Sequence, residues 1–211
     1  MKKVLCSIPP ILTIALLLAM VSGAAFAQAP ATGEDTAEYF TTNYFSNNTA
    51  AGAPDGTLRY TMHYGAVLQE RTLCANIYVF AADQQPTECC SCKITANGLV
   101  TASVKKNLTS NPLTGNIPAD GVVQIVSSLP VGGVCDPTFG FDGTPPTAPY
   151  PEVDSWMTHI QNNVGTAFPI TETSGLEELL TSEELTDLAY DCAFALEFGS
   201  GGAVCTCGTE K

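Results

Sequence analysis

Cysteine is the residue type of this chain with the richest potential chemistry. The 211 residues include nine cysteines, among them the close group Cys89, Cys90 and Cys92 and the late pair Cys205 and Cys207. Four thiolates from these groups could hold a tetrahedral zinc, although the C-x-C spacing is tighter than that of most zinc motifs. In an oxidising compartment the same sulfurs pair with one another. We therefore expect disulfides rather than a metal or redox site.

The disulfide candidates are the eight cysteines that come after residue 27, namely Cys74, Cys89, Cys90, Cys92, Cys135, Cys192, Cys205 and Cys207. Cys89 and Cys90 can bond each other only through a strained ring, so each is expected to reach a different partner. Bonded together, they would form a redox-active pair. Eight cysteines allow about a hundred pairings, and the sequence does not choose among them.

Two histidines, His63 and His159, are available for acid–base chemistry. Neither lies in an H-E-x-x-H motif, and no G-x-S-x-G segment supplies a serine nucleophile. We expect both rings at the surface and assign no catalytic, cofactor-binding or metal-binding residue. The alternative is a secreted hydrolase that uses His159 or nearby carboxylates under the loop of residues 130–151.

Acidic residues gather near the end of the chain. Glu183, Asp187 and Asp191 recur every four residues, which places like charges on one side of a helix. We interpret this stripe as a solvated face, and the alternative is a Ca²⁺ ion or a basic partner that neutralises it. No D-x-[DN]-x-[DN]-G loop supports calcium. The single tryptophan, Trp156, is either core packing or part of a ligand groove.

Residues 1–27 have the features of a signal peptide: Lys2 and Lys3, an apolar stretch, and an Ala-x-Ala end. Cleavage leaves 184 of the 211 residues, and the loss of two lysines takes the net charge from −13 to −15. The alternative is a leader retained as an anchor. The strongly negative net charge disfavours nucleic acid and anionic lipid as partners. After the leader, no stretch of the sequence is apolar enough to span a membrane. We expect a secreted, periplasmic or cell-surface protein, of bacterial origin by the form of its leader.

Short strands separated by turns are expected to hold the cysteines in place. The fold class is mainly β, an antiparallel β-sandwich or partly open barrel with one C-terminal α-helix packed by a disulfide. Residues 28–56 form a flexible segment with one strand around residues 38–45, and residues 81–88 have loop composition. A single domain then covers residues 57–211, with a β core over 57–129 and a long loop over 130–151 tied down through Cys135. Expected strands lie at residues 57–64, 74–80, 92–95, 99–105, 122–127, 152–161 and 167–171, of which 152–161 is also long enough for a helix.

A helix over residues 182–198 is the clearest element. Thr181 and Glu184 have the spacing of a capping box, and Gly199 is suited to a left-handed C-terminal cap. Its apolar positions, at helical spacing, are Leu185, Leu188, Ala189, Cys192 and Leu196. We expect Cys192 to bond Cys205 or Cys207, so that the short tail folds back on the helix.

Several segments, taken in order, resemble those of a group of uncharacterised exported bacterial proteins. They are LCANIYVF (73–80), ECCSC (88–92), NLTSNPLTG (107–115), WMTHIQ (156–161), ITET (170–173) and GSGGAVCTCG (199–208). The resemblance implies an exported, cysteine-bearing domain and nothing about activity. If the host were eukaryotic, Asn47 and Asn107 would be glycosylation acceptors, since each starts an N-x-T triplet.

These observations predict an exported, disulfide-stabilised module with a binding or structural role outside the cytoplasm. A secreted hydrolase near residues 130–151 and a thiol-based metal or redox protein are the competing hypotheses.

Overall fold

A computed structural model describes residues 38–47, 52–63, 72–138, 152–160 and 167–210. Contacts divide the chain into two units, Met1–Glu34 and Asp35–Lys211, and every described residue belongs to the second. The expected signal peptide and the part of the long loop at residues 139–151 lie outside the described residues. Among those described, no helix has the length and apolar character needed to cross a membrane.

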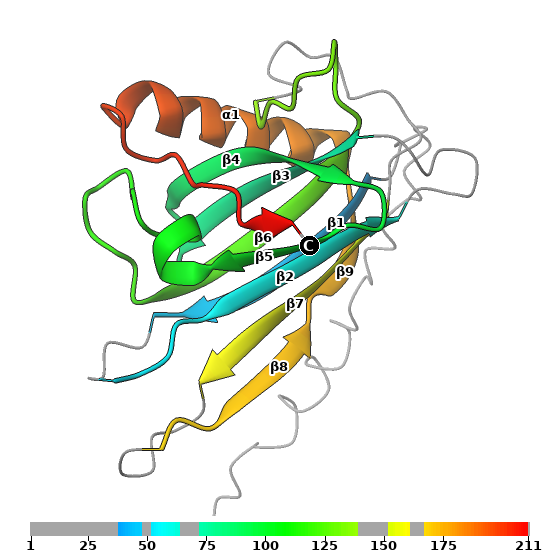
Figure 1. Cartoon of the computed structure of the whole chain (residues 1–211). Coiled ribbons are helices and arrows are strands. Elements are labelled where there is room, and N and C mark those ends of the chain that lie inside the picture. Colours follow the sequence, from blue (N-terminus) through cyan, green and yellow to red (C-terminus); the bar gives the residue numbers. More distant parts are fainter. Residues whose placement is uncertain (1–37, 48–51, 64–71, 139–151, 161–166, 211) are drawn as a thin grey trace, which may run out of the picture. The chain divides into compact units, whose positions relative to one another are not determined.

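Two antiparallel five-stranded sheets and one helix make up the described fold (Figure 1). Sheet A has the order β4-β3-β6-β1-β9, and sheet B has the order β10-β5-β2-β7-β8. The strands are β1 (Glu38–Ser46), β2 (Thr57–His63), β3 (Thr72–Ala81), β4 (Pro86–Thr95), β5 (Leu99–Ser103), β6 (Asp120–Ser128), β7 (Glu152–Ile160), β8 (Ile170–Ser174), β9 (Leu176–Leu180) and β10 (Thr209–Glu210). The predicted mainly antiparallel β fold with one C-terminal helix is confirmed, and the sheets do not close into a barrel.

The main core lies between the inner faces of the two sheets. In β2 the buried side chains alternate with half-exposed ones, so Leu58, Tyr60 and Met62 point inward. In β3 seven consecutive residues are buried because sheet B covers one face and the helix covers the other. Ile77 belongs to the core between the sheets and Tyr78 to the layer beneath the helix. The continuous apolar run of β3 is therefore explained by burial on both sides.

β8 and β9 are one bent strand that passes from one sheet to the other at Gly175. β8 pairs with β7 in sheet B, and β9 pairs with β1 in sheet A. A Cβ atom at Gly175 would collide with Ser155 of β7 and Asn43 of β1, so only glycine allows this approach. A chain that changes sheets at a bend forms the corner of a sandwich.

The helix α1 (Ser182–Phe198) crosses the outer face of sheet A from one edge to the other. It follows β9 directly, and Cys192 is bonded to Cys89 of the opposite edge strand, β4. The residues from Leu180 to Cys192 span about 18 Å at helical rise. Four strand spacings across the sheet amount to about 19 Å, so the helix has the length needed to cross it.

Both bounds of α1 are as predicted, but the left-handed C-terminal cap expected at Gly199 is wrong. Thr181 and Glu184 form the capping box, with the Glu184 backbone N–H donating to Thr181 Oγ1 at 3.2 Å. The buried side of the helix is the predicted one. Gly199 keeps right-handed geometry with φ −70°, because its N–H still donates to Ala195 in the helical pattern. The left-handed residues are Ser200, with φ 48°, and Gly201, with φ 90°.

Other boundaries also differ from the expected ones. The strand expected within the flexible segment is β1, and it lies between β6 and β9 inside sheet A, so the folded unit begins before residue 57. β4 begins at Pro86 rather than at residue 92, because it pairs with β3 along its whole length. The strand expected over residues 99–105 ends at Ser103, because residues 104–108 form a turn of π-helix in which the Ser103 side chain accepts from the Lys106 backbone N–H. β9 was not expected, and its strand conformation comes from its pairing with β1.

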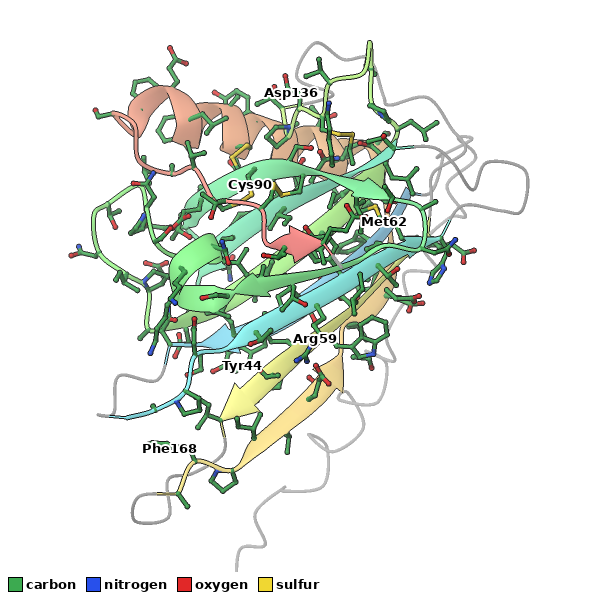
Figure 2. The ribbon with its side chains drawn as sticks, in the orientation of Figure 1. Tyr44, Arg59, Met62, Cys90, Asp136 and Phe168 are labelled. Carbon is green, nitrogen blue, oxygen red and sulfur yellow. A yellow bond between two sulfur atoms is a disulfide. The ribbon has the colours of Figure 1, made fainter. Side chains whose placement is uncertain are left out.

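All eight predicted cysteines form disulfides (Figure 2 draws them as yellow sulfur–sulfur bonds). The pairs are Cys74–Cys135, Cys89–Cys192, Cys90–Cys205 and Cys92–Cys207. Cys89 and Cys90 reach different partners, as expected. The predicted bond from Cys192 to the tail is wrong, because Cys192 faces β4 from the buried side of the helix.

The C-terminal tail runs from the edge of sheet A to the edge of sheet B. Cys89 exchanges backbone hydrogen bonds with Ala203 and Cys205, at 2.9 and 3.2 Å. Further along, β10 pairs with β5 of sheet B. The tail therefore protects the open edges of both β4 and β5, and two disulfides to β4 fasten it there.

Candidate ligand-binding face

The outer face of sheet B differs from that of sheet A, because α1 covers only sheet A. The alternation of burial and the strand register identify its side chains. The outer face of sheet B is defined as Thr57, Arg59, Thr61 and His63 of β2; Leu99, Thr101 and Ser103 of β5; Glu152, Asp154, Trp156 and Thr158 of β7; and Ile170, Glu172 and Ser174 of β8. Most of these side chains are polar, and several carry a hydroxyl group.

One row of side chains crosses this face in register. Thr101 pairs with Arg59, Arg59 pairs with Trp156, and Trp156 pairs with Ser174. Directly paired residues of antiparallel strands point to the same side. The central row therefore holds the single tryptophan between Arg59 and Ser174, with Thr101 beyond Arg59, over a width of about 14 Å.

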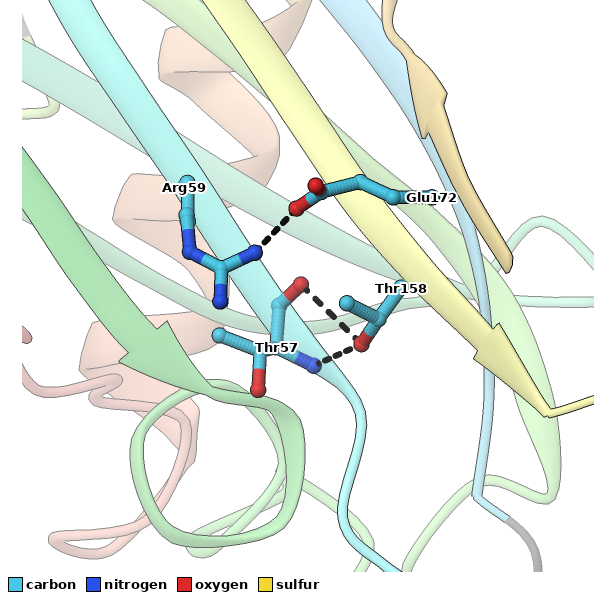
Figure 3. A network of polar contacts seen from close by, with 4 residues as sticks. All are labelled: Thr57, Arg59, Thr158 and Glu172. Atoms are coloured by element: carbon cyan, nitrogen blue, oxygen red, sulfur yellow. Dashed lines mark hydrogen bonds and ion pairs between the residues drawn. The ribbon is translucent and has the colours of Figure 1, made fainter. Parts of the chain in front are cut away.

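An ion pair spans β7 beside this row. Arg59 of β2 donates to the carboxylate of Glu172 of β8, and β7 lies between the two strands (Figure 3). The Arg59 side chain is 38% exposed and that of Glu172 is 42% exposed. Next to the pair, the Thr57 backbone N–H donates to Thr158 Oγ1 at 2.7 Å. Arg59 thus has a fixed position on an accessible surface.

A second acid–base pair lies further along the face. His63 Nε2 is 2.7 Å from an Asp154 carboxylate oxygen, and His63 Nδ1 is 3.0 Å from Asn97 Oδ1. When His63 is protonated, it forms with Asp154 a second pair of opposite charges on this face, beside that of Arg59 and Glu172.

Within the described residues, the hydroxyls of Thr61, Thr101 and Ser174 on this face make no hydrogen bond. They are free to bind a ligand or water.

The two histidines lie apart from each other. His63 is exposed, as predicted. His159 is half-buried rather than fully at the surface: it stacks on Tyr44 at 5.8 Å between ring centroids, and its Nε2 is 2.7 Å from Thr173 Oγ1. Burial lowers the pKa of His159, so the neutral ring is favoured there. These neighbours are an aromatic ring and a hydroxyl group, neither of which is an acid that could orient the imidazole for hydrolysis.

The described residues contain no cluster of three or more histidine, cysteine, aspartate or glutamate side chains that could hold a metal ion. The zinc alternative is wrong for this structure, since Cys89, Cys90, Cys92, Cys205 and Cys207 are all engaged in disulfides.

The acidic stripe lies on the exposed side of α1, as the sequence suggested. The pKa of Asp191 is raised, first by partial burial and then by the charge of Asp187. At the other end, hydrogen bonds from the Thr181 backbone and side chain lower the pKa of Glu184. The shift at Asp191 thus combines partial burial with repulsion between like charges four residues apart, and the shift at Glu184 reflects a satisfied N-terminal cap.

Glu88 is a buried titratable residue that the sequence pattern did not reveal. It points inward from β4, is 1% exposed, and accepts a hydrogen bond from the Asn111 backbone N–H at 2.7 Å through Oε1. Within the described residues, its Oε2 has no hydrogen-bond partner. Burial raises the pKa of Glu88 to about 7, against the opposing effect of the Asn111 hydrogen bond. The sequence analysis missed Glu88 because it expected this strand to begin at residue 92. A strand that begins at Pro86 turns the Glu88 side chain inward.

An open cavity of about 490 Å³ lies at the turn between β3 and β4. Its lining consists of Phe80, Ala81, Ala82, Gln84, Val122 and Gln124. None of these side chains titrates, so the cavity offers shape and amide hydrogen bonds but no acid–base group.

Both candidate glycosylation asparagines are engaged within the fold. Asn47 is buried, and its Nδ2 donates to Thr109 Oγ1 at 3.1 Å and to the Pro118 carbonyl at 2.8 Å. Asn107 Nδ2 donates to Thr206 Oγ1 at 2.9 Å. A glycan on either amide would displace these hydrogen bonds.

Comparison with protein-family models, curated proteins and solved structures finds no match to this chain.

Proposed function

We propose that the chain is an exported binding module that holds a neutral, polyhydroxylated polymer, such as a polysaccharide, on the outer face of sheet B. The observation that carries the proposal is the central row, in which Trp156 lies in register between Arg59 and Ser174 on an accessible sheet face. The multiple disulfides fit a module that works in an oxidising environment outside the cytoplasm.

The central row offers two kinds of contact that suit a sugar ring. An indole combines a broad apolar surface with one N–H donor, and the C–H face of a sugar ring is flat and weakly polar. Arg59 and Ser174 flank the indole, and Thr101 lies beyond Arg59, so the row offers donors and acceptors that suit hydroxyl groups. Several strands in register present these groups as a platform, which matches an extended polymer better than a small ligand in a closed cavity.

Charge favours a neutral ligand over an ionic one. Arg59 is already paired with Glu172, and Asp154 lies beside His63. The chain as a whole carries a net charge of −13, which repels anionic polymers such as nucleic acid. Removing an ionic partner from either pair would leave a charge without its neighbour, so hydroxyl ligands that hydrogen-bond to the existing pairs fit better.

The sole tryptophan makes the test direct, because intrinsic indole fluorescence reports on this face alone. The purified protein without residues 1–27 would be mixed with the neutral polymers cellulose, chitin, xylan and starch. Retention would be measured for the wild type and for Trp156→Ala, Trp156→Phe and Thr101→Val, and indole fluorescence for the wild type and Thr101→Val, which keep the tryptophan. The matched control is Ile117→Ala, an exposed apolar side chain outside the face.

We expect at least one polymer to retain the wild type and to protect Trp156 from an added quencher. Retention should fall at least tenfold in Trp156→Ala and less in Trp156→Phe, which keeps a flat ring. Thr101→Val should weaken binding, and Ile117→Ala should not. If no polymer retains the wild type, or if Trp156→Ala and Thr101→Val bind as it does, the proposal is wrong.

A further inference from the structure

We infer that the outward face of α1 is a docking surface for a basic, amphipathic segment of a partner protein. This surface is independent of the outer face of sheet B. It is defined by Tyr190, Phe194 and Phe198 together with Asp187, Asp191 and Glu197, and is called the α1 surface below.

Aromatic side chains recur every four residues along the α1 surface. Tyr190, Phe194 and Phe198 are 56%, 45% and 62% exposed, and the rings of Phe194 and Phe198 are 4.7 Å apart between centroids. Their spacing places them on one side of the helix, opposite the buried residues that pack on sheet A. A contiguous exposed aromatic stripe is a feature of interaction sites, whereas single exposed apolar residues are ordinary.

Carboxylates are interleaved with these rings. Asp187 precedes Tyr190 by one turn, and Asp191 precedes Phe194 by one turn. α1 contains five acidic residues and no lysine or arginine, and its last turn has no basic residue to offset the negative end of the helix dipole. The pKa of Asp191 is raised first by partial burial and then by the negative charge of Asp187, so a cationic partner would relieve the repulsion between these two carboxylates.

The combination of rings and carboxylates selects one kind of occupant. Lysine and arginine side chains can stack on an aromatic face and pair with a neighbouring carboxylate, so a basic segment satisfies both components. A second copy would bring a second acidic helix against the first, and an anionic membrane would be repelled in the same way. The partner is therefore a basic segment that carries apolar side chains between its cations.

The helix is held rigidly enough to act as a preformed surface. The Thr181–Glu184 capping box fixes its start, and the Cys89–Cys192 disulfide fastens it to β4 between Tyr190 and Phe194 in the sequence. A preorganised surface loses less conformational entropy on binding than a mobile one.

The test uses a fluorescein-labelled helical peptide with leucine on one face and arginine on the other. The charge control is the same peptide with every arginine replaced by glutamate. Anisotropy titrations would compare the wild type with the double variants Phe194→Ala/Phe198→Ala and Asp187→Asn/Asp191→Asn. The control double variant is Ile117→Ala/Val134→Ala, which removes two exposed apolar side chains elsewhere. All substituted side chains are largely exposed or on the helix surface, and circular dichroism would verify the fold.

We expect saturable binding of the arginine peptide to the wild type. The Kd should rise at least tenfold in each α1 variant, and 0.5 M salt should also raise the Kd of the wild type. The control variant should match the wild type, and the glutamate peptide should not bind. Absence of saturable binding, or equal Kd values for the wild type and Phe194→Ala/Phe198→Ala, would refute the inference. Self-association that this variant abolishes would assign the surface to a second copy and would also refute it.

Discussion

Glu88 gives the sharpest quantitative prediction about this fold, because its carboxyl is buried with one oxygen unpartnered among the described residues. Its pKa is raised from 4.5 to about 7, chiefly by burial. The folded protein therefore binds a proton at Glu88 in a pH range where the unfolded chain has released it. The contribution of Glu88 to stability must then fall as the pH rises from about 4.5 to about 7, since at this residue the folded state binds more protons than the unfolded state.

The size of this effect follows from the shift. The rise in the pKa of Glu88 from 4.5 to about 7 corresponds to a free-energy difference of about 3 kcal/mol, because each pKa unit is worth about 1.4 kcal/mol. The contribution is fully present below pH 4.5, and it is lost once the pH has passed 7. Glu88→Gln removes the titration while keeping an oxygen that can accept from the Asn111 N–H. The variant should therefore lack this part of the pH dependence.

The assay is urea unfolding of the oxidised protein at half-unit steps from pH 4.5 to 7.5. The quantity of interest is the wild-type free energy of unfolding minus that of Glu88→Gln, which should decrease by about 3 kcal/mol across this range. His159 acts in the opposite direction, because its lowered pKa makes its contribution fall as the pH drops. It is present in both proteins and cancels in the difference.

Glu177→Gln on the exposed part of β9 is the matched control, and its curve should follow the wild type within about 0.5 kcal/mol. Parallel curves for the wild type and Glu88→Gln over the whole range would refute the reasoning. They would mean that Glu88 is ionised in the fold and that its charge is compensated there.

Three further predictions concern the elements that hold the sheets together. Gly175→Ala should destabilise the fold by about 1–3 kcal/mol in urea, because the added Cβ collides with Ser155 and Asn43 at the corner between the sheets. Thr181→Ala should cost about 1 kcal/mol by the same measurement, through loss of the helix cap. Under limiting reductant, alkylation and mass mapping should detect Cys207 before Cys90 or Cys205, because only Cys207 of the three is exposed.

Local sequence patterns predicted the elements whose signal does not depend on distant pairing. β2 is buried on one face, and its sequence therefore alternates between apolar and polar residues. β3 is buried on both faces, and its sequence is therefore a continuous apolar run. The start of α1 was also predictable, since the capping box uses only Thr181 and Glu184. β9 was not, because all but its last residue are exposed and its conformation depends on β1, far away in the sequence.

The disulfide pairing has a usable signal in the spacing of the cysteines. Cys90 and Cys92 are two residues apart, as are Cys205 and Cys207, and residues at that spacing in extended chains point to the same side. Cys89 then points to the opposite side, toward the helix and Cys192. The row on the outer face of sheet B lacks such a signal, since it arises only when four strands come into register.

An exported chain would present these cysteines in an order that hinders correct pairing. Cys89, Cys90 and Cys92 bond partners that lie 103 to 115 residues later in the chain. A chain that crosses a membrane from its N-terminus exposes these three thiols, together with Cys74, well before any native partner has arrived. Oxidation of consecutive thiols at that stage would trap mispaired intermediates, and thiol–disulfide exchange takes seconds to hours. Efficient maturation after export therefore requires a host compartment that reshuffles disulfides as well as one that forms them.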